Sequence, residues 1–378
     1  MLDSFELRNF KSARDLKVRL APLTVLTGLN GSGKSTVLQA IALLKQSLRV
    51  GVLNQELLLR GPLVRLGRSE DVRFENAESD EISFVVRTPN GDIRLSSPTI
   101  PDRDILPLSY HGDIDDLVTQ FEVGFQLIQA DRITPVGHYE EASTSQRATG
   151  WLGCRGEYTV DFLSQNQSKR IPVGRLFPRE HSSLSAELLN QVAPTESLLD
   201  QTSGWLQHLS PGVRPRAAGV ELAEATSLRF SYTGTTVDSS SREHRPSNVG
   251  FGLTYCLPII VACLAAENGA LLLLENPEAH LHPRGQSALG QLLAQCAADG
   301  VQIIVETHSD HILNGIRIAA KQGDISSDDV AVHFFSRDIE SGESSITSPI
   351  LHANGRFSDW PEGFFDEWSR ALDQLLDI

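Results

Sequence analysis

Two short stretches of the sequence carry side chains that could do chemistry together. The first is GLNGSGKST, from Gly28 to Thr36, which combines glycines with a lysine and hydroxyl groups. It matches the G-x4-G-K-S spacing of a phosphate loop, and it lies between an apolar segment typical of a strand and a periodic segment typical of a helix. Glycines in such a loop let main-chain N–H groups turn inward around phosphates, which the helix N-terminus also attracts.

We therefore expect this loop to bind the phosphates of ATP. Lys34 would place a positive charge beside them, and the Ser35 hydroxyl would bind Mg²⁺. The expected nucleotide contacts in the loop are Asn30, Gly31, Ser32, Gly33, Lys34, Ser35 and Thr36.

The second stretch is LLLLENPEAHLHP, from Leu271 to Pro283. Beside a phosphate loop, an apolar strand that ends in an acidic residue is typical of the strand that holds the metal of an ATPase. Glu275 would hold Mg²⁺ through water, and Glu278 would polarise the attacking water as the general base.

Three histidines near these segments allow more than one interpretation. His280 and His282 could bind zinc, but the H-x-H pair has no third ligand nearby, so we favour loop residues at a subunit contact. His308 follows the apolar stretch VQIIVET, where it could donate a hydrogen bond to the γ-phosphate and sense its loss. A capping or core histidine is the alternative at position 308.

Composition and charge limit the remaining function classes. The chain has 378 residues and a net charge of −15, which argues against a surface coated with nucleic-acid contacts. A local basic groove stays possible, with VRPR (Val213–Arg216) and SKRIPVGRLFPRE (Ser168–Glu180) as candidates. No apolar run reaches the roughly 20 residues of a membrane span, and no secretory signal is visible. We expect a cytoplasmic protein whose cysteines, Cys154, Cys256, Cys263 and Cys296, are buried thiols.

The order of predicted elements indicates an α/β fold. Strands are predicted over residues 5–10, 15–20 and 23–28, and a helix follows the phosphate loop. PNGD predicts a hairpin turn within ISFVVRTPNGDIRLSS. From Gly250 onward, helices over 253–266, 282–300 and 309–323 alternate with strands over 270–274 and 301–307. This alternation predicts a mostly parallel sheet covered by helices, followed by a closing hairpin and a tail helix.

We expect one split domain in four parts. Residues 1–136 form an N-terminal lobe with an antiparallel β subdomain and the phosphate loop, and 137–246 form an inserted helical lobe. Residues 247–350 carry the acidic strand and His308, and 351–378 form a helical tail. Phe364, Phe365 and Trp368 share one face of that tail, which either packs on the body or docks a partner.

The motifs resemble those of a known class. FELRNFKSARDLKVRLAPLTVLTGLNGSGKST, ENPEAHLHP and ETHSDHIL resemble parts of ABC-class ATPase heads, in the branch that includes SMC, RecF and overcoming-lysogenization-defect (OLD) proteins. Ser247–Gly252 (SNVGFG) and Trp360–Asp366 resemble segments of small stand-alone ATPases in a family labelled only as of unknown function. The resemblance covers both ends of the chain, and the middle matches loosely.

The resemblance implies a signature loop that caps the ATP of a second subunit. SNVGFGLT fills that place, although it lacks the usual L-S-G-G-Q wording. Main-chain N–H groups of Gly250 and Gly252 would contact the nucleotide, together with a side chain of Asn248, Ser247 or Thr254. Gln55 is the candidate for the glutamine that links the nucleotide to the other lobe. These features imply a homodimer, or a higher even-numbered oligomer, held head to tail by ATP and Mg²⁺.

The resemblance also suggests what the ATPase serves. We expect slow, regulatory hydrolysis that controls a separate effector such as a nuclease, in bacterial antiphage defence. The stretch after His308 is expected to hold a hairpin and a helix and not the Toprim nuclease of OLD proteins. The alternative is a RecF/SMC-like ATPase that clamps DNA. A transporter motor is disfavoured by the inserted middle and the absent L-S-G-G-Q.

Overall fold

The chain is divided into two structural units. The computed structural model describes residues 1–49, 56–179, 184–220, 223–233, 242–361, 364–365 and 367–376. Unit 1 comprises Met1–Val123, Gln302–Asp310 and Ser326–Ile378. Unit 2 comprises Gly124–Val301 and His311–Ile325.

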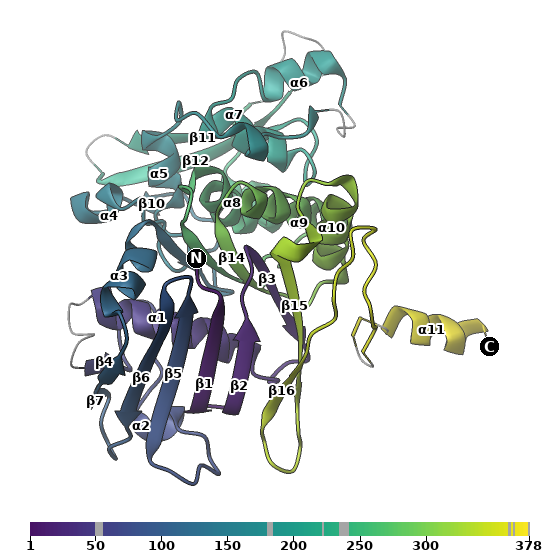
Figure 1. The fold of residues 1–378 in the computed structure, drawn as a ribbon. Helices are drawn as coiled ribbons and strands as arrows, with labels where there is room; N and C mark the ends of the chain where they lie inside the picture. The colour runs from purple at the N-terminus through teal and green to yellow at the C-terminus, as the bar shows by residue number, and fades with distance from the viewer. Residues whose placement is uncertain are drawn as a thin grey trace. The chain divides into compact units, whose positions relative to one another are not determined.

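Unit 1 contains an antiparallel five-stranded sheet, as the N-terminal alternation predicts (Figure 1). Its strands, in sheet order, are β2 (Ala13–Arg19), β1 (Ser4–Phe10), β5 (Glu81–Thr88), β6 (Gly91–Pro98) and β8 (Ser109–His111). Phe5 and Leu7 of β1 are buried while Arg8 is exposed, so one face of the sheet belongs to the core. The predicted hairpin is confirmed, because Thr88 pairs with Gly91 across a two-residue turn.

Unit 1 also holds the parallel strands that carry the phosphate loop. β3 (Leu23–Gly28) lies between β14 (Gln302–Glu306) and β15 (Val330–Arg337), and both neighbours run parallel to it. β16 (Ser344–Thr347) pairs antiparallel with β15 and forms the expected hairpin. The helix α1 (Lys34–Arg49) follows β3 after the loop, as predicted.

Short elements complete unit 1. β4 (Glu56–Leu58) pairs with β7 (Ile105–Pro107), and the helices are α2 (Ser69–Val72), α3 (Ile114–Glu122), η4 (Ser327–Asp329) and α11 (Glu367–Leu376). Just before α11, Phe364 is buried and its ring contacts those of Phe334, Phe357 and Trp360. This contact favours packing of the tail at Phe364, and the Trp368 side chain lies outside the described residues.

Unit 2 is built on an apolar helix and a short parallel strand pair. β13 (Leu271–Glu275) pairs in parallel with β9 (Phe125–Ile128). The helix α8 (Phe251–Ala265) is mostly buried and lies beside α9 (Pro283–Ala298), as Figure 1 shows. α10 (Asp310–Gln322) belongs to unit 2 from His311 onward. These helices and β13 confirm the alternation predicted from Gly250.

The middle of the chain contains the expected helices and also a sheet that the sequence does not predict. Its helices are α4 (Thr144–Ala148), α5 (Thr159–Gln165), η1 (Val173–Arg175), α6 (Ala186–Val192) and α7 (Leu198–Leu206). It also contains an antiparallel sheet in the order β10 (Tyr139–Glu140), β12 (Ala225–Tyr232) and β11 (Val213–Val220). β12 buries alternate residues, and β11 accepts Pro215 because it is an edge strand. The helical prediction was therefore incomplete.

Three arginines of the two arginine-rich segments form ion pairs. Arg175 is buried, and its Nε lies 2.7 Å from Oδ2 of Asp299. Arg170 pairs with Glu196 and Arg216 pairs with Glu243. These three arginines therefore have carboxylate partners within unit 2, and a basic groove along the two segments stays a prediction.

The cysteines agree in part with the expectation of buried thiols. No disulfide joins any of the four cysteines, all of which are described. Cys256, Cys263 and Cys296 are buried, whereas Cys154 is only partly buried. Within the described ranges, none of the helices is both long enough and apolar enough to cross a bilayer.

Candidate nucleotide-binding site

The phosphate loop is shaped by close approaches that only glycine permits. Gly28, at the end of β3, has a φ of 138°, and a Cβ there would lie 2.3 Å from the carbonyl oxygen of Phe335. Gly33 has a φ of 104°, and a Cβ there would lie 2.3 Å from Oγ of Ser344. The Ser344 hydroxyl in turn donates a hydrogen bond of 2.7 Å to the carbonyl oxygen of Ser32. The loop is thus fixed against β15 and β16.

The loop fits a polyphosphate. The buried hydroxyl of Ser32 has no hydrogen-bond partner among the described residues, whereas Asn30 and Gly31 are exposed at the loop surface. The helix α1 has 16 residues and no acidic residue in its first turn, so its partial positive charge is uncompensated there. Ser35, on this first turn, is partly exposed.

Lys34 is buried inside the loop. Its Nζ donates hydrogen bonds to the carbonyl oxygens of Gly28 (3.1 Å) and Leu29 (2.8 Å). Nζ also lies 3.9 Å from Oε1 of Glu306, a residue that the sequence analysis did not select. The signal for Glu306 is a carboxylate at the end of an apolar strand, two residues before His308.

His308 belongs to the same unit as the loop. Glu306 of β14 pairs with Leu26 of β3, so the carboxyl ends of the two parallel strands are neighbours. Thr307 then donates its main-chain N–H to the Leu26 carbonyl oxygen at 3.0 Å. His308 follows as an exposed residue before α10, so the structure does not make it a core histidine.

The two glutamates of ENPE lie on one turn of unit 2. Glu275 ends β13, and its Oε2 accepts a hydrogen bond from the main-chain N–H of Ala130 at 3.1 Å. Asn276 follows with a φ of 44°, a left-handed conformation that asparagine tolerates. Glu278 is partly exposed, and its carbonyl oxygen accepts from the N–H of Leu281.

Arg132 holds this turn, although no motif in the sequence indicates this role. Its fully buried guanidinium donates to the carbonyl oxygens of Glu275 (2.9 Å) and Asn276 (2.8 Å). The guanidinium also lies 5.4 Å from the ring centre of Tyr255 in α8. Burial lowers the pKa of Arg132 below its usual value, and the nearby Glu278 carboxylate acts in the opposite direction.

The SNVGFG segment lies where the resemblance predicts, directly before α8. Pro246–Asn248 form a short 3-10 helix (η3), and Gly250 is the N-cap residue of α8. Among the side-chain candidates, Asn248 and Ser247 are exposed, whereas Thr254 is buried. A Cβ on Gly252 would lie 2.6 Å from the carbonyl oxygen of His280, so this segment packs closely on the loop that follows Glu278.

The histidines of AHLHP have structural contacts. The rings of His280 and Tyr255 are 4.6 Å apart, and Nδ1 of His282 accepts a hydrogen bond from the N–H of Arg284 at the start of α9. Among the described residues, no group of three or more histidine, cysteine, aspartate or glutamate side chains is placed to hold a metal ion. The zinc alternative therefore finds no support.

The linking glutamine stays a prediction. Gln55 lies outside the described residues. Gln129 directly follows β9, whose Ile128 pairs with Leu274 beside Glu275. The apolar run FQLI before Gln129 is the signal that could have identified this strand end.

Unit 1 thus gathers the phosphate loop, Glu306 and His308. Unit 2 gathers Glu275, Glu278, Arg132 and the SNVGFG segment. A phosphate loop between a buried parallel strand and a helix, together with an acidic strand end further along the chain, defines an ATPase of the P-loop class.

Comparisons with known proteins agree with this class. Residues 1–96 match an AAA ATPase domain. Residues 166–314 match an AAA domain model whose description ends "AbiEii toxin, Type IV TA system", and residues 325–375 match a "Protein of unknown function (DUF3696)". An OLD nuclease of Thermus scotoductus is 23% identical over 337 residues, which cover 82% of this chain and 59% of that relative. The chain therefore spans about three-fifths of the relative's length.

Solved structures share the fold at low identity. A crystal structure of an SMC head bound to the C-terminal winged-helix domain of ScpA matches with a TM-score of 0.53, at 16% identity, over 93% of this chain and 98% of that chain. An SMC head with an extended coiled coil, bound to the C-terminal domain of ScpA from Pyrococcus furiosus, matches with a TM-score of 0.51, at 13% identity, over 100% and 99%. The chain therefore has an SMC-head-like fold, and two of its segments match AAA ATPase domains.

Proposed function

We propose that this chain binds ATP with Mg²⁺, hydrolyses it slowly, and associates with a second copy around the nucleotide. The observation that carries the proposal is the loop from Gly28 to Lys34, whose glycines, buried lysine and unpartnered Ser32 hydroxyl form a cradle for phosphates. The coarser class, a P-loop ATPase, is already given by the fold and the family matches.

The roles of the residues follow from their chemistry. Lys34 and the main-chain N–H groups of the loop bind the phosphates, and Ser35 with Glu275 hold the metal ion. Mg²⁺ supplies positive charge that neutralises the phosphate oxygens during hydrolysis. Glu278 accepts the proton of the attacking water, whose oxygen bonds to the γ-phosphorus as the bond to ADP breaks. His308 donates a hydrogen bond to the γ-phosphate.

A second copy would complete the site through its signature segment. The N–H of Gly250 stands at the positive end of the 15-residue helix α8, and Ser247 and Asn248 are exposed beside it. A dimer held this way forms when ATP is bound and separates after hydrolysis, because only the triphosphate contacts both copies. Control of a separate effector such as a nuclease, in antiphage defence, is supported by analogy with the matched toxin and OLD nuclease.

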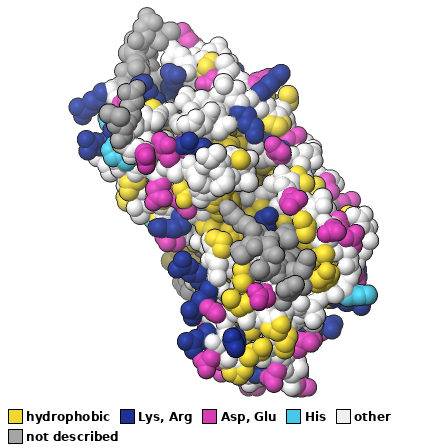
Figure 2. Space-filling view, turned by 90° about the vertical axis from the view of Figure 1, so that its left-hand side faces the viewer, with side chains coloured by type: hydrophobic (Ala, Val, Ile, Leu, Met, Phe, Trp, Pro, Cys, Tyr) yellow, Lys and Arg dark blue, Asp and Glu magenta, His cyan; other side chains and the backbone are white. Residues whose placement is uncertain are grey.

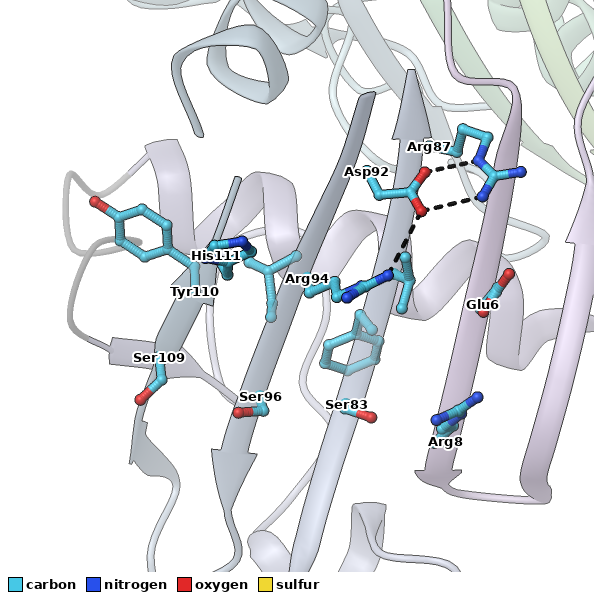
Figure 3. A pocket seen from close by; sticks show the side chains of 13 residues that line it. Glu6, Arg8, Ser83, Arg87, Asp92, Arg94, Ser96, Ser109, Tyr110 and His111 are labelled. Carbon is cyan, nitrogen blue, oxygen red and sulfur yellow. Dashed lines mark hydrogen bonds and ion pairs between the residues drawn. The ribbon is translucent and has the colours of Figure 1, made fainter. Parts of the chain in front are cut away.

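A DNA-clamping function is the second candidate, and a hollow on the outer face of the five-stranded sheet favours it. The hollow has a volume of about 530 Å³, and Figure 3 shows side chains of β1, β5, β6 and β8 lining it. Arg8, Ser83, Ser96 and Ser109 form one row across it, because each is in register with the next. Arginine and serine are common partners of DNA phosphates.

The charges of this hollow are only partly available to a polyanion. Nε of Arg87 lies 2.7 Å from Oδ1 of Asp92, and an Arg94 nitrogen lies 3.9 Å from Oδ2. Arg8 and Arg94 are more than half exposed, whereas Glu6 is mostly buried. Figure 2 shows basic and acidic side chains interspersed on the face that it draws, so no broad basic surface supports this candidate there.

Equilibrium binding and turnover test the proposal. The wild-type chain should bind a fluorescent ATP analogue in Mg²⁺ and release phosphate slowly, and Lys34→Ala should abolish both. Lys17→Ala, which removes an exposed lysine of β2, is the matched control and should change neither. Absence of nucleotide binding by the folded wild-type chain would refute the proposal. The DNA clamp would be favoured if duplex DNA stimulates turnover at a stated salt concentration and the Arg94→Ala variant loses this stimulation.

A further inference from the structure

A buried carboxylate faces the lysine of the phosphate loop. Nζ of Lys34 and Oε1 of Glu306 are 3.9 Å apart, and the two side chains are only 2% and 7% exposed. Glu306 ends β14, where it pairs with Leu26 of β3, the strand that leads into the loop. The same strand pairing therefore places the carboxylate and the lysine next to each other.

The second oxygen of the Glu306 carboxylate, Oε2, is buried without a hydrogen-bond donor among the described residues. A buried carboxylate is costly unless an opposite charge lies close to it, and the ammonium group of Lys34 is that charge. The lysine that should attract phosphate is thus already compensated by a neighbouring anion.

We infer that Glu306 competes with phosphate for Lys34 and thereby makes nucleotide binding depend on Mg²⁺. The inference rests on the proposed nucleotide-binding function. When the ammonium group of Lys34 binds phosphate, the Glu306 carboxylate remains buried nearby and repels the incoming negative charge. A metal ion on the nucleotide reduces that charge, so the loop selects the magnesium complex over free ATP.

A purely structural ion pair makes a different prediction. Breaking such a pair would lower the stability of the chain and weaken the binding of every nucleotide. The affinities for Mg–ATP and for free ATP would then change by the same factor. The ratio of these two affinities therefore isolates the electrostatic role of Glu306. It is a binding measurement and does not depend on turnover.

Titration with a fluorescent ATP analogue measures this ratio. Dissociation constants are compared in excess Mg²⁺ and in excess EDTA for the wild type, Glu306→Gln, Glu306→Asp and Glu81→Gln. Glu81 is an exposed residue at the start of β5, so its variant controls for the loss of one carboxylate from unit 1. For Glu306→Gln, the dissociation constant in EDTA divided by that in Mg²⁺ should be about tenfold smaller than for the wild type, because the variant lacks a negative charge close to the phosphates. The other two variants should keep the wild-type ratio.

The outcomes separate this inference from the proposed function. A folded Glu306→Gln variant with the wild-type ratio would overturn the role of Glu306, whereas a wild type that binds no analogue in Mg²⁺ would refute the proposed function instead. If Glu306→Gln does not fold, the free energy of unfolding of Lys34→Met is compared with that of the double variant Lys34→Met/Glu306→Gln. The double variant should be the more stable, because it no longer buries an uncompensated carboxylate, and equal or lower stability would overturn the pairing.

Discussion

The guanidinium of Arg132 donates a hydrogen bond of 2.9 Å to the main-chain carbonyl oxygen of Glu275. A second hydrogen bond reaches Asn276, and the ring of Tyr255 in α8 lies 5.4 Å from the guanidinium carbon. One side chain therefore connects the turn that carries both acidic residues with the helix that follows the SNVGFG segment. We interpret Arg132 as the residue that positions Glu278 relative to that segment.

Replacing Arg132 by lysine should separate positioning from nucleotide binding. Lysine keeps the charge but cannot reach both carbonyl oxygens, so the free energy of unfolding should fall by about 3 kcal/mol. Turnover should fall at least about tenfold while nucleotide affinity stays within about threefold, because the lost contacts do not involve the phosphate loop. Arg155→Lys, an exposed arginine paired with Asp131, is the control. Wild-type turnover in Arg132→Lys would contradict this role.

Two glycines of the phosphate loop should differ sharply in their tolerance of alanine. A Cβ on Gly33 would meet Oγ of Ser344 at 2.3 Å, whereas a Cβ on Gly31 would meet nothing within 4 Å. Gly33→Ala should weaken nucleotide binding about a hundredfold, since the loop must shift. Gly31→Ala should cost about 1 kcal/mol of stability through its positive φ and still bind. Titration and chemical denaturation measure both effects, and similar losses of affinity in the two variants would show that the contact with Ser344 does not matter.

The pH dependence of stability should report on His333. Its Nε2 lies 2.7 Å from the Arg19 carbonyl oxygen, so it donates there, and Nδ1 accepts from the Ser348 hydroxyl at 2.7 Å. Burial lowers the pKa of His333 below its ordinary value of 6.5. The unfolded chain then binds a proton at this histidine more readily than the folded chain does. The contribution of neutral His333 to the free energy of unfolding is therefore fully present above pH 6.5 and is lost as the pH decreases, by at most about 1.4 kcal/mol per pH unit.

Variants of two histidines check this pH prediction. Free energies of unfolding are measured from about pH 7.5 to about pH 5, a range that spans the titration of histidine. His333→Gln should flatten the profile, because glutamine does not titrate there. His352→Gln, at an exposed position, should retain the wild-type slope. A profile of His333→Gln as steep as that of the wild type would assign the slope to other groups.

The tail should divide into a structural part and an exposed part. Phe364 is fully buried, and its ring stacks edge to face with that of Trp360 at 4.8 Å. Phe364→Ala should therefore lower the free energy of unfolding by about 3 kcal/mol. Leu375 is 81% exposed, and Leu375→Ala should change stability by less than about 0.5 kcal/mol. Equal effects would mean that α11 packs on the body through Leu375 as well.

Local patterns were enough to predict the phosphate loop and the elements around it. β3, β13 and β14 are buried apolar runs that end at candidate site residues. The helices after β13 and β14 end near Gly300 and Gly323, both with positive φ. Such features depend on neighbours in the sequence, so a single sequence reveals them.

Long-range contacts could not be predicted in this way. Arg132 and Glu275 are 143 residues apart in the chain, and no periodicity links them. The pairing of Lys34 with Glu306 likewise depends on the parallel alignment of β3 with β14. The sheet formed by β11 and β12 was missed because Pro215 and several arginines interrupt its apolar alternation.

The most direct test of the central claim is the mass of the Glu278→Gln variant in solution. Light scattering at saturating ATP and Mg²⁺ should show a dimer, since the variant binds ATP but cannot release it by hydrolysis. Adding Gly250→Asp should leave nucleotide binding intact and return a monomer, because a side chain there has open space in the folded chain but places a negative charge at the signature segment. A Glu278→Gln variant that holds ATP and remains monomeric would contradict the claim that ATP joins two copies.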